Sequence, residues 1–76
     1  MREIQVGKIY KHFKGHVYKV IDIVNDAEDY PNKMVIYENI YDSSDKWARP
    51  YDMFNSKVDK EKYPDVKQEY RFEEVK

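Results

Sequence analysis

The sequence predicts a mainly β fold, a small antiparallel barrel of five or six short strands with one helical turn near residues 50–55. Residues 8–24 are rich in Ile, Val, Tyr and Phe on both sides of Gly15, a pattern typical of two strands joined by a tight turn. Eight Tyr, three Phe and one Trp supply a thin core with bulky side chains. Because the chain is small, we expect Phe54 and Phe72 to lie in that core.

The register of the first hairpin has two solutions, which differ in the length of the loop. A two-residue loop places Tyr10 and Tyr18 on opposite faces of the hairpin. A three-residue loop with a glycine bulge pairs Tyr10 with Tyr18 and His12 with His16, and so gathers two phenols and two imidazoles on one face. In either case Gly15 is expected to adopt a positive φ.

The later elements follow from alternation and from turn residues. Residues 33–41 are apolar nearly throughout, which is typical of a strand with one face in the core and the other partly covered. A turn over residues 42–45 and Pro50 bound a short strand, since Pro cannot donate to a ladder. Pro50 also suits the start of a helical turn from which Met53 and Phe54 drop inward. We therefore expect strands near residues 8–13, 16–24, 33–41, 46–49 and 70–74.

Charge is distributed unevenly along a chain whose formal net charge is −1. Residues 1–20 carry five Lys or Arg and one Glu, a net charge of +4, whereas residues 21–45 carry one Lys and seven Asp or Glu, a net charge of −6. The low overall charge argues against a dedicated binder of long nucleic acid. The basic hairpin is either a binding surface or a set of Lys residues that prevent edge-to-edge association of strands.

The composition also indicates the compartment. Cysteine is absent, which fits a reducing cytoplasm. No apolar run approaches the roughly 20 residues of a membrane-spanning helix. We expect a single cytoplasmic domain over residues 1–76, with no cofactor and no membrane contact.

Trp47 and Arg49 form the most suggestive pair of residues. They lie two apart on one short strand and so project from the same face. An indole can stack on a planar ligand, and a guanidinium can form two parallel hydrogen bonds with a phosphate or carboxylate. With Tyr10, His12 and Lys14 of the basic hairpin, they make up the predicted ligand-binding site.

Each of these side chains also has a structural interpretation. Trp47 fits a core position, and Arg49 can pair with an acid such as Glu38 or Asp52. His12 can pack beside a tyrosine and bond to the backbone. The two histidines suggest a metal, but the sequence dictates no third ligand near them, so we expect no metal site.

Three motifs, taken together, carry a resemblance to a known family. They are Tyr10-x-His12-Phe13-Lys14-Gly15, then Trp47-x-Arg49-Pro50-x-x-Met53-Phe54, then Arg71-Phe72. At this separation they resemble the small bacterial family catalogued as domain of unknown function 1653, over nearly the whole chain. The resemblance implies an SH3-like barrel and no established activity.

These observations favour binding over catalysis. The three serines lie in turns without an obvious base, and two glycines cannot build a phosphate loop, so we do not expect an enzyme. The first hypothesis is a domain that binds a planar anionic ligand, a nucleotide or a short single-stranded nucleic acid. The alternative is an SH3-like peptide-binding or protein-assembly module, and a homodimer is compatible with either.

Overall fold

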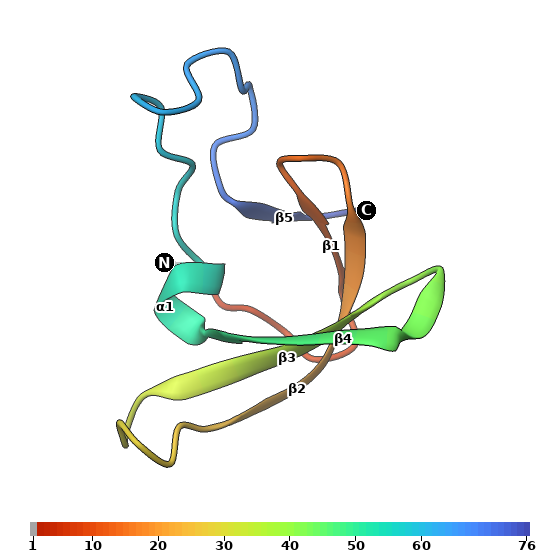
Figure 1. Cartoon of the computed structure of the whole chain (residues 1–76), viewed down its shortest axis with the longest axis vertical. Helices are drawn as coiled ribbons and strands as arrows, with labels where there is room; N and C mark the ends of the chain where they lie inside the picture. Colours follow the sequence, from red (N-terminus) through yellow and green to blue (C-terminus); the bar gives the residue numbers. More distant parts are fainter. Residues whose placement is uncertain (1) are drawn as a thin grey trace.

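Five strands form one antiparallel sheet in residues 2–76, the part of the chain that the computed structural model describes (Figure 1). The order of strands across the sheet is β4-β3-β2-β1-β5. The strands are β1 (Ile9–His12), β2 (Val17–Asn25), β3 (Lys33–Asn39), β4 (Asp42–Pro50) and β5 (Phe72–Glu74), and the helix is α1 (Tyr51–Phe54). The mainly β prediction is confirmed. Over the same residues, no helix has the length and apolar character needed to cross a bilayer.

The prediction of a closed barrel is wrong, because the sheet remains open. β4 and β5 stand at opposite ends of the strand order, and within the described residues they do not pair with each other. β5 is only three residues long and pairs with β1. Side chains connect the two edges instead. Phe54 belongs to α1, which directly follows β4, and its ring stacks on Phe72 of β5. The chain between α1 and β5 loops away from the sheet on the same side as the β1–β2 turn (Figure 1).

The first hairpin adopts the three-residue loop. Tyr10 lies opposite Tyr18, and the backbone N–H of His12 donates to the carbonyl of His16 over 2.8 Å. Gly15 closes the loop with φ +104°, and its N–H donates to the carbonyl of His12 over 2.8 Å. The expected positive φ is confirmed, and Tyr10, His12, His16 and Tyr18 share one face, as this register requires.

The core lies against this same face of the sheet, which we call the concave face. Phe54 and Phe72 are fully buried, and their rings stack with centroids 4.0 Å apart and an angle of 6° between planes, so their predicted core positions are confirmed. Met53 was expected to turn inward with Phe54, but 49% of its surface is exposed. The helix is one turn long, so it buries one face, and Met53 lies on the other. The buried residues are Ile4, Tyr10, Val20, Val35, Tyr37, Phe54, Val58 and Phe72.

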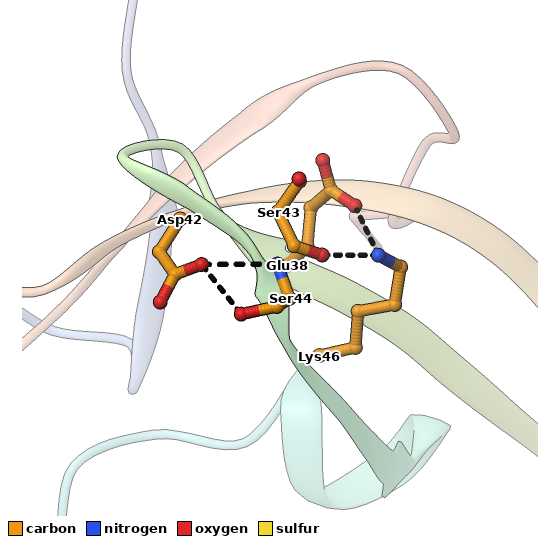
Figure 2. Close-up of polar contacts among 5 residues, drawn as sticks. All are labelled: Glu38, Asp42, Ser43, Ser44 and Lys46. Carbon is orange, nitrogen blue, oxygen red and sulfur yellow. Dashed lines mark hydrogen bonds and ion pairs between the residues drawn. The ribbon is translucent and has the colours of Figure 1, made fainter.

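β4 starts earlier than predicted, at Asp42 rather than near residue 46. Asp42 Oδ1 accepts hydrogen bonds from the backbone N–H of Ser44 over 3.1 Å and from its hydroxyl over 2.6 Å (Figure 2). These bonds lower the pKa of the Asp42 carboxyl. Lys46 Nζ lies 3.3 Å from Glu38 Oε1 across the β3–β4 pair. The Asp and Ser residues at 42–45, which predicted a turn, therefore form the first part of β4.

Candidate functional site

Arg49 and Trp47 lie on the concave face, beyond the part that the core fills. Val35 is opposite Arg49 and Tyr37 is opposite Trp47 in the β3–β4 ladder. Residues directly opposite each other in a ladder share a face, and Val35 and Tyr37 are buried core residues. Trp47 is nevertheless 51% exposed, because the open sheet places no strand over it. The core interpretation of Trp47 therefore does not hold.

A cavity of about 360 Å³ lies beside Arg49 at the β1–β2 turn. Its lining includes four cationic side chains, Lys14, Arg49, Lys62 and Arg71, and one carboxylate, Asp59. With His12 neutral, the lining carries a net charge of +3. We call this cavity, with these four cations, the cationic chamber.

The four cations of the chamber have no acidic partner in residues 2–76. The ion pairs in this part of the chain join Lys46 to Glu38 and Lys57 to Glu69. The Asp59 carboxylate accepts hydrogen bonds from the backbone N–H groups of residues 61 and 62, over 3.0 and 3.3 Å. It is thus engaged in a local turn, and the positive charge of the chamber remains uncompensated.

Arg49 is held in place by two core side chains. Its Nε donates to the hydroxyl of Tyr37 over 3.2 Å. Its guanidinium carbon lies 5.5 Å from the centre of the Phe72 ring, within the range of a cation–π contact. The alternative interpretation, in which Arg49 pairs with Glu38 or Asp52, does not hold. Within the described residues the two terminal amino groups of Arg49 have no hydrogen-bond acceptor, so they can bind a ligand.

His12 stands at the chamber wall as a neutral ring. Burial, followed by the positive charges of Arg49, Lys14 and Arg71, lowers its pKa to about 4. Nδ1 accepts a hydrogen bond from the backbone N–H of Lys14 over 3.1 Å, so the proton of the neutral ring is assigned to Nε2. The ring packs against Phe13 and Phe72, at centroid distances of 4.5 and 4.9 Å. It therefore offers one N–H donor at neutral pH.

A second, smaller hollow of about 120 Å³ adjoins the chamber. We call its aromatic wall, formed by His16, Tyr18, Tyr37 and Trp47, the aromatic shelf. The Tyr18 and Tyr37 rings meet edge to face at 5.1 Å. Three residues line both hollows, namely His12, Lys14 and Arg49. The chamber and the shelf therefore adjoin, with more of the cationic side chains in the larger hollow and more of the aromatic ones in the smaller.

The family model described as "Protein of unknown function (DUF1653)" matches residues 8–74. The chain belongs to this family. No curated protein and no solved structure matches it. The matched range of this DUF1653 domain contains every residue of the cationic chamber and the aromatic shelf, and the description assigns no activity.

The DUF1653 domain brings together four of the five residues predicted for its site. His12, Lys14, Trp47 and Arg49 all line the smaller hollow. Tyr10 does not lie on this surface, because it is only 2% exposed. Its hydroxyl accepts a hydrogen bond from the backbone N–H of Gln5 over 3.0 Å, and burial raises its pKa. It shares the face of His12 but lies deeper, under Phe54.

Six residues of the chamber lining were not among those predicted, and Lys62, Tyr63 and Arg71 are three of them. The Tyr63 ring lies 4.9 Å from Phe13, and Lys14 Nζ lies 5.7 Å from the centre of the Tyr63 ring. These contacts hold the segment between α1 and β5, which we call the excursion, against the β1–β2 turn. An aromatic residue in the middle of a charged segment was the available signal, but the segment has no periodicity that places it in space.

Proposed function

We propose that this DUF1653 domain is a non-catalytic binding domain for a planar anionic ligand, a nucleotide or a short single-stranded nucleic acid. The observation that supports the proposal is that the cationic chamber and the aromatic shelf adjoin and share His12, Lys14 and Arg49. A nucleotide has the same two ends, a charged phosphate and a planar base. The shelf suits the base and the chamber suits the phosphate.

The placement of Arg49 and Trp47 supports a single ligand that reaches both hollows. Two residues along a strand are separated by roughly 7 Å, a distance that one sugar can span. Arg49 is already held by Tyr37, so less side-chain freedom is lost when it binds an anion. Half of the Trp47 surface is exposed, so its indole can be covered by a base.

The charge of the whole chain limits the length of the ligand. The formal net charge is −1, so long nucleic acid would meet acidic segments outside the chamber. Four cations line the one cavity. This favours a mononucleotide or an oligonucleotide of a few residues, with affinity that falls as salt is added.

Trp47 is the single tryptophan of the chain, so its fluorescence tests the proposal directly. We expect adenosine monophosphate and a tetranucleotide, titrated at low salt, to quench the emission with saturation. Arg49→Lys, which keeps the charge but loses the two-pronged geometry, should weaken binding about tenfold. Lys8→Gln removes a charge from an exposed residue outside both hollows and should leave binding unchanged. A wild-type protein that binds no member of this panel contradicts the proposal.

The exposed shelf supports a second candidate, an SH3-like peptide-binding or protein-assembly module. Trp47 and Tyr18 form the kind of aromatic wall on which extended proline-rich segments dock. Salt separates the two candidates, because docking on aromatic rings is little affected by ionic strength and phosphate binding weakens steeply. Salt-insensitive binding of a proline-rich peptide, without nucleotide binding, would favour this candidate.

A further inference from the structure

We infer that the group held in the cationic chamber is a terminal phosphate monoester, as on a mononucleotide or at the phosphorylated end of a short strand, rather than an internal phosphodiester. This inference rests on the proposed function and narrows it to a class of ligand.

The charge of the chamber matches a monoester better than a diester. The lining carries four cations against one carboxylate that is engaged in a turn. An internal phosphodiester brings a single negative charge, whereas a phosphate monoester at neutral pH brings about −1.5 to −2. The additional charge of the monoester offsets more of the +3 lining.

The donors of the chamber also outnumber what a diester can accept. A monoester offers three terminal oxygens, and a diester in a chain offers two. The lining supplies the terminal groups of Arg49, the Nε2–H of His12 and the ammonium group of Lys62. The Arg71 guanidinium also lines the cavity, and none of the side-chain hydrogen bonds or ion pairs within residues 2–76 engages its terminal amino groups. The third oxygen gives this set an acceptor that a diester lacks.

The cations come from four separate parts of the chain that meet at the cavity. Lys14 belongs to the β1–β2 turn and Arg49 to β4. Lys62 lies in the excursion that follows α1, and Arg71 immediately precedes β5. The residues shared with the aromatic shelf mark the side on which the rest of the ligand continues. A phosphate at the end of a ligand needs one such continuation, whereas an internal phosphate needs two.

The test compares two tetranucleotides of one sequence, with and without a 5′-phosphate, together with adenosine monophosphate and adenosine. We expect the phosphorylated strand to bind about tenfold more tightly than the unphosphorylated strand. Adenosine monophosphate should exceed adenosine by a similar factor. Lys62→Gln changes an exposed residue, so it should leave folding intact while it reduces both ratios. Lys8→Gln should preserve both ratios.

The outcomes separate this inference from the proposed function. If both strands bind equally, with saturable quenching of Trp47, the nucleotide site stands and the terminal-phosphate inference is overturned. If no nucleotide binds at low salt, both fail. If adenosine monophosphate binds as tightly as the phosphorylated strand, the ligand is a small nucleotide. If the phosphorylated strand binds more tightly, the ligand is the phosphorylated end of a strand. Both of these last results support the inference.

Discussion

The hydroxyl of Tyr37 accepts a hydrogen bond from Nε of Arg49 over 3.2 Å and so joins the core to the candidate site. Tyr37 is 3% exposed, and its ring meets both Phe54 and Phe72 edge to face, at 5.2 and 5.4 Å. The position of the guanidinium is therefore set by packed rings, although its terminal groups line an open cavity.

Tyr37→Phe should weaken nucleotide binding several-fold, because Arg49 loses the bond that orients it. The unfolding free energy should fall by about 1 kcal/mol, a typical value for one lost hydrogen bond. Tyr51→Phe is the matched control, since the Tyr51 hydroxyl accepts from the backbone N–H of Ile4 over 2.8 Å and does not line either hollow. The control should lose similar stability and keep its affinity. Equal affinities in all three proteins would show that Tyr37 does not position Arg49.

Phe54→Ala and Phe72→Ala should each leave the protein largely unfolded. Both side chains are fully buried, and removal of a buried phenyl ring costs roughly 3–5 kcal/mol out of the roughly 5–15 kcal/mol that stabilises a domain. Met53→Ala changes the exposed neighbour of Phe54 and should cost no more than about 0.5 kcal/mol. Chemical denaturation followed by circular dichroism measures the differences. A cooperative transition near the wild-type midpoint for Phe72→Ala would show that β5 is peripheral.

Gly15→Ala and Gly15→Val should destabilise the protein through backbone strain. Gly15 has φ +104°, a conformation that residues with a Cβ rarely adopt. A Cβ placed there meets no atom within 4 Å, so a clash makes no contribution. Both variants should lose roughly 1–3 kcal/mol, measured by thermal or denaturant unfolding. Unchanged melting temperatures would mean that the loop relaxes into another conformation without cost.

Stability should fall as the pH is lowered from 7 to 5, in part because of His12. Its pKa is about 4 in the folded protein and about 6.5 when unfolded, so the unfolded chain takes up the proton first. The stabilisation is complete above pH 6.5 and is lost as the pH falls toward 4. The groups that act on His12 are Arg49, Lys14, Arg71 and His16.

His12→Asn tests this pH dependence, because the amide oxygen can replace Nδ1 as the acceptor for the Lys14 N–H without titrating. Denaturant unfolding at pH 7 and pH 5 should show a smaller loss for the variant than for the wild type. The difference should be on the order of 1 kcal/mol after allowance for solvent screening at this half-buried ring. An identical pH profile in the two proteins would rule out His12 as the source.

Local patterns predicted the elements of this fold but not its closure. The turn at Gly15 and the strand near residues 33–41 were predicted from patterns among residues that are neighbours in the sequence. The corresponding strands are present. Closure depends on whether two distant edges meet. The Phe54–Phe72 stack bridges those edges with side chains rather than with a backbone ladder, and no local pattern encodes that choice.

The candidate site was predictable in part, for the same reason. The two-residue spacing of Trp47 and Arg49 fixes a common face on any strand. Lys62 and Arg71 reach the chamber because a long irregular segment folds back onto the β1–β2 turn, and nothing in their spacing indicates this. Tyr10 was expected on a solvent-reachable surface but is buried, because the face it shares with His12 extends from the open surface into the core.

Nucleotide binding at this surface is tested most sharply by a nuclear magnetic resonance titration of ¹⁵N-labelled protein with adenosine monophosphate at low salt. We expect the Trp47 indole N–H and the backbone amides near Lys14, Arg49, Lys62 and Arg71 to shift together along one saturation curve, since one ligand spans both hollows. The amides of the β2–β3 loop, between Asn25 and Lys33, should not move. Saturating shifts confined to that loop, or no shifts at all, would contradict nucleotide binding across the cationic chamber and the aromatic shelf.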